Sequence, residues 1–347
     1  MRLINTTTIR LEEFNECEAP PYAILSHTWG NQEVTFHEIR DEPPVWKAGY
    51  QKIVETCRLA RDSAISYAWV DTCCIDKTSS AELSEAINSM FRWYEKAMTC
   101  YAFLSDIPPG TTSSQLTKSR WFSRGWTLQE LIAPPCLVFY NSNWEVLATR
   151  AQIRDRISDT TGICASYLSD NTKDIHRRLS LASIAQRMSW AAQRQTTRTE
   201  DLAYCLLGIL GINMPLLYGE GEHSFIRLQE EIIRHTNDHS IFAWNLSTFN
   251  LKGSAPAHDP VDHAGMLAPT PRAFVGSRDV VSIETGEDST PFLLTNRGIQ
   301  INMRIFREGH SHLPQGSECV DASSLLADGW PSCARLGIFA GFALFSS

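Results

Sequence analysis

The stretch Tyr22-Ala-Ile-Leu-Ser26 is a short apolar run, and the turn-prone His27-Thr-Trp-Gly30 follows it directly. A run of this length that is bounded by turn residues indicates a buried β-strand. Further runs of the same character are Tyr67-Ala-Trp-Val70, Cys100-Tyr-Ala-Phe-Leu104 and Cys136-Leu-Val-Phe-Tyr140. The four runs predict four buried strands between residues 20 and 140.

Amphipathic segments separate these strands. Residues 50–64 are predicted to be helical, with Ile53, Cys57, Ala60 and Ala64 on one stripe. Ser79 followed by Glu82 has the spacing of a capping box, which marks a helix start. The apolar face of that helix would be Leu83, Ile87, Met90, Phe91, Tyr94 and Ala97. Strands that alternate with single helices imply βαβ units, so the predicted fold class is α/β, with a mainly parallel sheet and flanking helices.

The texture of the sequence changes after residue 140 and again after residue 245. Helices are predicted at about 150–160, 179–191, 197–210 and 221–235. Short β-type runs then occur at Val280–Ile283, Phe292–Thr295 and Ile299–Ile305. We therefore expect one domain over 1–245, made of a sheet core (20–140) and a helical extension (141–245), and a β-leaning C-terminal region over 246–347.

Composition excludes several classes of protein. The 347 residues are 43% hydrophobic, which supports a folded core, and the net charge of −8 argues against general nucleic-acid binding. No apolar run approaches the ~20 residues of a membrane span, and the N-terminus lacks the apolar segment of a signal peptide. We expect a cytoplasmic protein with no metal site, whose ten cysteines are reduced and mostly buried.

Polar residues follow the predicted strands at the edge where α/β folds place their active sites. Ser26 and His27 end the first strand and Asp71 follows the second, so parallel neighbours would bring them to one crevice. The alternative is that they are ordinary turn residues, because Ser and Asp are common where strands end. A Ser26-His27-Asp71 triad is disfavoured, because adjacent strand residues point to opposite faces.

The segment Ser119–Ile132 concentrates basic, hydroxyl and aromatic residues around one acid, Glu130. Two roles fit this glutamate. Thr127-x-x-Glu130 matches a capping box, in which the carboxylate only closes the start of a helix. Alternatively, Glu130 is a carboxylate in an aromatic-walled cleft, where burial would change its pKa and direct it at a polar ligand.

Three blocks of the sequence resemble the fungal heterokaryon incompatibility (HET) domain. They are Tyr22-Ala-Ile-Leu-Ser-His-Thr-Trp-Gly30, Trp69-Val-Asp-Thr-Cys-Cys-Ile-Asp-Lys77 and Ser119-Arg-Trp-Phe-Ser-Arg-Gly-Trp-Thr-Leu-Gln-Glu-Leu-Ile-Ala-Pro134. The resemblance implies a role in non-self recognition at fungal cell fusion, which triggers programmed cell death. It also implies protein partners in incompatibility signalling and self-association into a homo-oligomer.

HET domains are in turn distantly similar to Toll/interleukin receptor (TIR) domains, which have a flavodoxin-like parallel sheet. In NAD-cleaving TIR domains a catalytic glutamate lies in a stretch similar to Trp126-Thr-Leu-Gln-Glu-Leu131, and it would fall on Glu130. This resemblance implies NAD as a substrate, with no bound cofactor. The residues that would line the crevice are Ser26, His27, Asp71, Trp121 and Trp126. Since many TIR domains are only scaffolds, an NAD glycohydrolase and a non-enzymatic interaction module both remain hypotheses.

Overall fold

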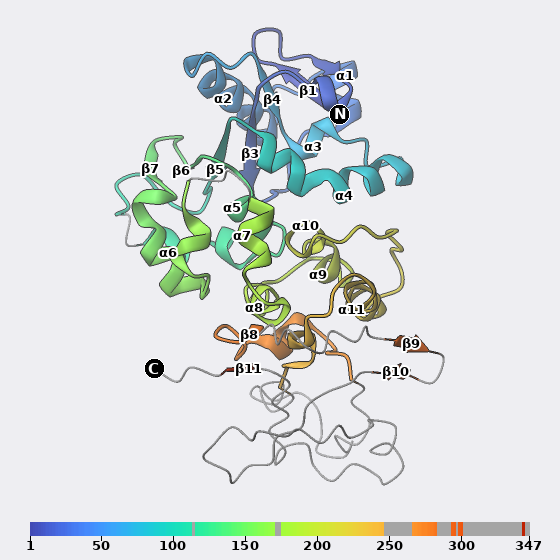
Figure 1. Cartoon of the computed structure of the whole chain (residues 1–347). Coiled ribbons are helices and arrows are strands. Elements are labelled where there is room, and N and C mark those ends of the chain that lie inside the picture. The colour runs from blue at the N-terminus through green and yellow to red at the C-terminus, as the bar shows by residue number, and fades with distance from the viewer. Residues whose placement is uncertain are drawn as a thin grey trace. The chain divides into compact units, whose positions relative to one another are not determined.

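The computed structural model describes residues 1–112, 115–170, 175–245, 266–282, 293–295, 298–300 and 342–343 (Figure 1). The chain divides into two compact units. Unit 1 comprises Met1–Leu179 and Arg194–Leu216, and unit 2 comprises Ser180–Gln193 and Leu217–Ser347. The predicted domains, 1–245 and 246–347, stay predictions, because most residues after 245 lie outside the described ranges.

Unit 1 is built on a seven-stranded mixed sheet with the order β2-β1-β4-β3-β5-β6-β7. Its strands are β1 (Arg2–Asn5), β2 (Leu11–Glu13), β3 (Tyr22–His27), β4 (Tyr67–Trp69), β5 (Thr99–Phe103), β6 (Leu137–Tyr140) and β7 (Val146–Thr149). The four predicted strands are confirmed as β3 to β6, and each pairs in parallel with its neighbours among them. The expectation of a mainly parallel sheet holds only for this centre, because β1, β2 and β7 add antiparallel pairs at the two edges.

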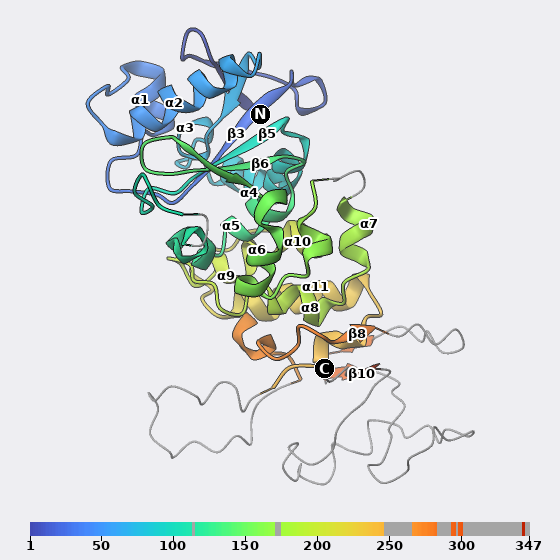
Figure 2. The same ribbon diagram turned by 90° about the vertical axis from the view of Figure 1, so that its left-hand side faces the viewer.

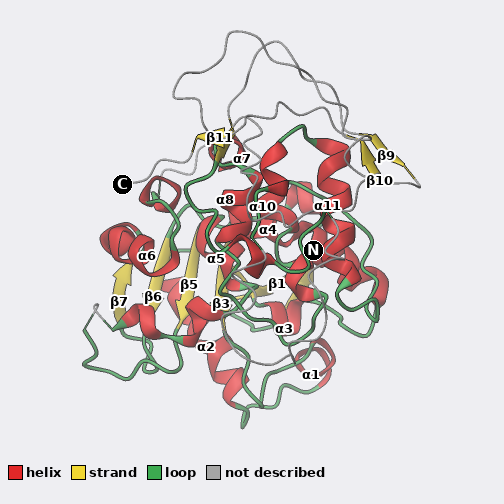
Figure 3. Ribbon diagram, turned by 90° about the horizontal axis from the view of Figure 1, so that it is seen from below, coloured by secondary structure: helices red, strands yellow, loops and turns green. Residues whose placement is uncertain are grey.

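The order of the four parallel strands places a reversal at the centre of the sheet. Along the sheet their chain order is second, first, third, fourth, so the connections leave β3 and β5 in opposite directions. Strands β3, β5 and β6 lie side by side in Figures 2 and 3. In open α/β sheets such a reversal opens a crevice at the carboxyl ends of the strands, which is where ligands usually bind.

The helices of unit 1 cover both faces of this sheet. They are α1 (Phe36–Asp41), α2 (Ala48–Asp62), α3 (Asp71–Cys74), α4 (Ser80–Lys96), α5 (Thr127–Ile132), α6 (Arg154–Thr161), α7 (Ile175–Ser180), α9 (Asp201–Tyr204) and α10 (Leu207–Leu210). Helix α2 lies on one side of the strands, and α4 and α5 lie on the other (Figure 3). All six residues of β3 are buried, as expected for a central strand that is covered on both faces.

Helix α4 begins where the sequence predicts. The Ser79 side chain accepts a hydrogen bond from the Glu82 amide, which caps the first turn, and the predicted apolar face is largely buried. The helix predicted at 197–210 is instead two short helices, α9 and α10, and α10 ends at Gly211 in the left-handed region with φ of 71°. That conformation favours glycine, so Gly211 accounts for the end of the helix after Leu210.

Gly208 is required where α10 packs against α4. A Cβ at this position would lie 2.0 Å from the Cβ of Phe91, an atom that no side-chain rotation can move. We expect Gly208→Ala to lower the free energy of unfolding by about 1–3 kcal/mol, because the two helices must separate. Urea unfolding measures this. Gly30→Ala is the control, since its Cβ would meet nothing closer than 3.6 Å; equal stability of both variants would contradict the expectation.

The cysteines are only partly as predicted. All eight in the described ranges are free thiols, at positions 17, 57, 73, 74, 100, 136, 164 and 205. Cys17 and Cys164 are exposed rather than buried, whereas Cys73 and Cys74 are buried in α3. Cys319 and Cys333 lie outside the described residues.

Unit 2 contains helices α8 (Ile184–Ser189) and α11 (His223–His235). The predicted apolar face of α11 is confirmed, with Phe225, Leu228, Ile232 and Ile233 buried. Short antiparallel pairs join β8 (Val281–Ser282) to β11 (Phe342–Ala343) and β9 (Leu293–Thr295) to β10 (Gly298–Gln300). The run predicted to continue to Ile305 lies outside the described residues beyond 300. Within the part of the chain that is described, no helix is long and apolar enough to cross a bilayer.

Candidate functional site

A buried hydrogen-bonded chain joins β3 to α5 on one face of the sheet. The Ser26 hydroxyl donates to the Glu130 carboxyl, and the Trp121 indole donates to Ser26 Oγ at 2.7 Å. Ser26 and Trp121 are fully buried, and Glu130 is 7% exposed. Ser26 therefore meets two residues that lie 95 and 104 positions later in the chain, at the carboxyl end of β3 and directly beside the reversal of strand order.

The environment of Glu130 favours its neutral form. Burial raises the pKa of the Glu130 carboxyl to about 8, although the hydrogen bond from Ser26 acts in the opposite direction. The charge of Asp71 raises this pKa further, while Tyr94 and Arg194 lower it. A glutamate with a pKa near the working pH can exist in both protonation states, which is the usual requirement for a catalytic acid or base.

This raised pKa predicts a pH dependence of stability. An unfolded glutamate titrates near pH 4 (about 4.3), so between that pH and about 8 the unfolded chain loses its proton while the folded one keeps it. The contribution of the Glu130 carboxyl to the free energy of unfolding is therefore fully present below about pH 4, and it decreases as the pH rises toward 8. Replacement by Gln should remove the slope, and the wild type should lose on the order of 3 kcal/mol relative to Glu130→Gln between pH 5 and 8.

Urea unfolding of both proteins across this pH range is the measurement. Asp71 does not interfere, because its transition lies in the acid range below this window. Parallel pH profiles for the wild type and Glu130→Gln would show that Glu130 titrates normally in the folded protein.

The capping role considered for Glu130 is wrong. Trp126, not Thr127, occupies the N-cap position of α5, and it makes no side-chain cap hydrogen bond. The Thr127 hydroxyl instead donates to the carbonyls of Trp121 and Arg124. Because the Glu130 carboxyl contacts Ser26 of the sheet, α5 presents this side chain to the strand ends.

A segment that follows much later in the chain, residues 194–195, is hydrogen-bonded to the loop before α5. Arg194, which is 7% exposed, donates to the Arg124 carbonyl at 2.8 Å and to Thr127 Oγ1 at 3.0 Å. Gln195 pairs with the same loop, because its amide donates to the Ser123 carbonyl at 2.7 Å and its carbonyl accepts from the Gly125 amide at 2.8 Å. Segment 194–195 therefore fixes the backbone that carries Trp121 and Glu130.

His27 belongs to a different cluster on the opposite face of β3. Its Nε2 lies 3.1 Å from Asp71 Oδ1, and Lys52 Nζ lies 3.0 Å from its Nδ1. Because the ammonium group of Lys52 can only donate, Nδ1 accepts and Nε2 carries the proton that is donated to Asp71. The Trp29 indole donates to the other Asp71 oxygen at 2.8 Å. Burial acts to raise the pKa of Asp71, but Lys77, His27 and Trp29 together lower it to about 2.

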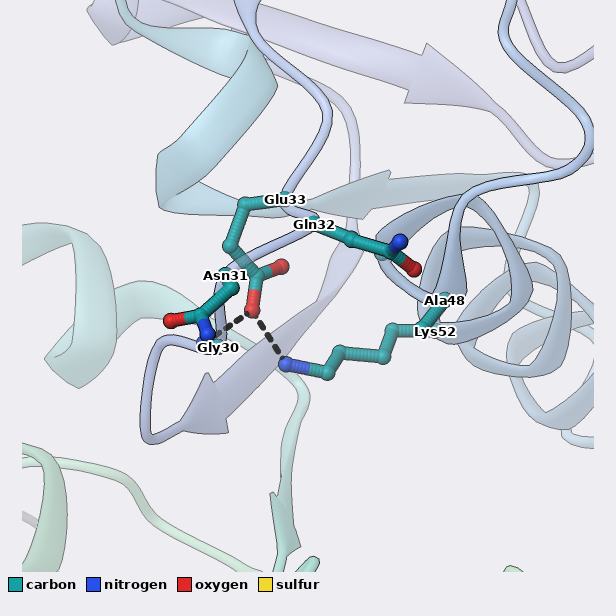
Figure 4. Close-up of a pocket in the computed structure, with 7 residues that line it drawn as sticks. Gly30, Asn31, Gln32, Glu33, Ala48 and Lys52 are labelled. Atoms are coloured by element: carbon teal, nitrogen blue, oxygen red, sulfur yellow. Dashed lines mark hydrogen bonds and ion pairs between the residues drawn. The ribbon is translucent and has the colours of Figure 1, made fainter.

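A pocket of about 330 Å³ opens beside this second cluster, and its lining includes Gly30, Glu33 and Lys52 (Figure 4). Glu33 binds both the Lys52 ammonium and the Gly30 amide. Gly49 allows the loop to approach α2, since a Cβ there would lie 2.6 Å from the Gln32 carbonyl oxygen. The pocket wall thus contains one ion pair, between Lys52 and Glu33, whose charges neutralise each other.

The structure divides the predicted site residues into two groups. Ser26, Trp121 and Glu130 form one hydrogen-bonded chain, and His27 with Asp71 forms the other. Trp126 is half-buried at the start of α5 and joins neither group through a hydrogen bond in the described residues. Among these residues, no group of three His, Cys, Asp or Glu side chains is placed to hold a metal ion.

Sequence reasoning missed two buried basic residues near the site, Lys52 and Arg194. Lys52 is in helical register with the buried Thr56 and Ala60, a pattern that could have placed it on the inner face of α2. No comparable signal marks Arg194, because its partners lie about 70 residues earlier in the chain.

The comparisons with known proteins identify two matched regions of the sequence. Residues 22–111 match the profile of the heterokaryon incompatibility protein family (HET), and residues 223–297 match a domain of unknown function, DUF8212. The chain therefore contains a HET domain, as its sequence blocks indicated. Ser26, His27 and Asp71 lie inside the matched range, whereas Trp121, Trp126 and Glu130 lie beyond residue 111.

The chain is similar to the vegetative incompatibility protein HET-E-1 of Podospora anserina. The two are 44% identical over 224 residues, which cover 61% of this chain and 16% of that protein. The chain thus spans about a sixth of its relative's length. No solved structure matches the chain.

Proposed function

We propose that this chain is the HET module of an effector of fungal heterokaryon incompatibility, and that it breaks the bond between nicotinamide and ribose in NAD with Glu130 as the catalytic carboxylate. The observation that carries the catalytic part is the contact of Glu130 with Ser26 at the carboxyl end of β3. A buried carboxyl with a raised pKa at the strand reversal has the position and chemistry of an active-site group.

The strand order supports a TIR-like reading of the fold. The parallel strands β4-β3-β5-β6 follow the order second, first, third, fourth, which is the beginning of the flavodoxin-like order. In the proposed flavodoxin-like arrangement, α5 carries its glutamate into the crevice at the reversal. Fold likeness alone does not establish activity, so the proposal depends on the placement of Glu130.

The proposed reaction is hydrolysis of one glycosidic bond. The bond from ribose C1′ to the pyridinium nitrogen breaks, and its electron pair goes to the nitrogen, which leaves neutral nicotinamide. The ionised Glu130 carboxylate would stabilise the positive charge that develops on the ribose. A water oxygen then bonds to C1′, and the proton that it releases passes to Glu130 and on to solvent. Because the ionised form is needed, the rate should rise with pH toward a plateau above about 8.

The biological part of the proposal rests on the relative's name, vegetative incompatibility protein HET-E-1. In our proposal, NAD loss in the cytoplasm after non-self recognition leads to cell death. Partner proteins, or self-association into a homo-oligomer, would start the reaction. The chain covers 16% of that relative, so the trigger would lie in segments that this chain does not match.

A second function is favoured by the burial of the same carboxyl. With 7% of its surface exposed, Glu130 also fits a structural hydrogen bond that holds α5 on the sheet. In this case the chain would be a non-enzymatic interaction module that assembles death-signalling complexes.

One experiment separates the two functions. The purified chain is incubated with NAD, alone and after clustering through a fused oligomerising tag, and nicotinamide is followed by chromatography. Stoichiometric appearance of nicotinamide and ADP-ribose supports catalysis. Intact NAD in both preparations, together with retained cell killing, would support the interaction module.

A further inference from the structure

Arg120 lies across the carboxyl ends of the two strands where the order reverses. Its Nε donates to Thr28 Oγ1 at 3.2 Å, and its Nη2 donates to Ser105 Oγ at 3.2 Å. Thr28 directly follows β3, and Ser105 lies two residues beyond β5. Strands β3 and β5 pair in register up to His27 and Phe103, so the guanidinium group bridges their ends.

The side chain of Arg120 is oriented, but its charge is not neutralised. No carboxylate of the described residues lies within ion-pair distance of the guanidinium group, whose partners are two neutral hydroxyls. Asp106 fixes the backbone beneath it, because its carboxylate accepts from the Arg120 amide at 2.8 Å and from Ser119 Oγ at 2.6 Å. A guanidinium group has five N–H donors, so several remain for a ligand on its exposed side.

The side chains of Arg120 and Glu130 both lie at the carboxyl end of β3. Ser26 is near the end of β3, and Thr28 directly follows the strand. Ser26 binds Glu130, and Thr28 binds Arg120. Trp121, the residue after Arg120, also reaches Ser26. Arg120 and the proposed catalytic carboxyl therefore both bind residues at the carboxyl end of β3, Arg120 through Thr28 and Glu130 through Ser26.

The neighbouring acidic groups are engaged elsewhere. Asp71 binds His27 and the Trp29 indole, and Glu33 binds Lys52. The ammonium group of Lys77 lies 3.6 Å from the centre of the Trp29 ring, which is 53% exposed and follows Thr28. Thr28, which binds the unneutralised Arg120, is thus followed in the chain by an exposed aromatic ring that carries a second cation.

We propose that Arg120 binds the pyrophosphate of a dinucleotide at the carboxyl ends of β3 and β5, and so positions the ligand's ribose toward Glu130. This proposal rests on the proposed function and specifies which part of the substrate is recognised. A planar guanidinium group forms two parallel hydrogen bonds with phosphate oxygens, a geometry that lysine cannot reproduce.

The test measures binding without catalysis. Calorimetry is performed on the full chain carrying Glu130→Gln, with ADP-ribose, inorganic pyrophosphate and adenosine as separate probes. ADP-ribose should bind, and Arg120→Gln should weaken its binding about 10–100-fold, with Arg120→Lys nearly as weak. Adenosine should bind no more weakly to Arg120→Gln than to the parent protein. Lys118→Gln is the matched control, because it removes one exposed cation from the same loop.

The outcomes separate this proposal from the one it rests on. If ADP-ribose binding depends on Arg120 but the wild type releases no nicotinamide, the phosphate site holds and NAD cleavage fails. If nicotinamide is released and Arg120→Gln leaves the KM for NAD unchanged, cleavage holds and the phosphate site fails. Equal loss with Lys118→Gln, or tighter binding of inorganic pyrophosphate than of ADP-ribose, would also overturn a dinucleotide site. So would the absence of binding by every probe.

Discussion

Glu130→Gln is expected to reduce nicotinamide release from NAD by at least about 10³-fold while the protein remains folded. The variant keeps the size of the side chain and an oxygen that accepts from Ser26, but it can never carry the negative charge that stabilises the developing ribose cation. Cell killing on overexpression should disappear with the activity, and cellular NAD should stay at its normal level. Stability should not fall, because a neutral side chain suits this buried position.

The matched control for this variant is Glu82→Gln. Glu82 belongs to the same unit, where its carboxylate binds Arg2 and the Asp76 amide, neither of which belongs to the site. Its replacement should change nicotinamide release by less than a few-fold. Killing that persists in folded Glu130→Gln, with NAD unchanged, would reject catalysis and leave the interaction module.

Arg150→Met is expected to lower the free energy of unfolding by about 3–5 kcal/mol, the largest stability effect that we predict. Arg150 is fully buried and donates to carbonyls at the end of α5, to the Ser169 carbonyl at 3.2 Å and to the Asp170 carboxylate at 3.0 Å. The carbonyls are those of Leu131, Ile132 and Pro134. Methionine fills similar space without a donor, so these buried carbonyls would lose their partner.

Chemical unfolding measures this effect, and Arg154→Met is the control. Arg154 is about half exposed and lies 3.6 Å from Asp155, so its loss should change stability by less than about 0.5 kcal/mol. Similar stabilities of Arg150→Met and the wild type would mean that water replaces the lost donor.

The central strands were predictable because each is a continuous apolar run. Strands β3 and β5 are buried along nearly all of their length, and the polar residues of β3, Ser26 and His27, stand only at its end. The edge strands lack this property: β2 has no buried residue, and Val146 of β7 is 64% exposed. Their pairing is set by neighbouring strands rather than by their own composition, and the mixed character of the sheet was therefore missed.

The contact of Ser26 with Glu130 could be anticipated from the rule that strand ends converge, whereas the separation of His27 from Ser26 follows from strand alternation. Local spacing misled in one place. Thr127 and Glu130 have the interval of a capping box, but Arg194 and the carbonyl of Trp121 engage the threonine hydroxyl. Those contacts come from tertiary structure, and a four-residue motif carries no information about it.

The return of the chain at Arg194 has a practical consequence for dividing this protein into fragments. Unit 1 is discontinuous, since it ends at Leu179 and resumes over Arg194–Leu216. A fragment cut after the last parallel strand would retain every residue of the Ser26–Glu130 pair, yet it would lose the guanidinium and amide groups that brace the loop before α5. Gene fusions, truncations and recombinant boundaries that preserve the site must therefore run to at least Leu216, well past the end of the family match at residue 111.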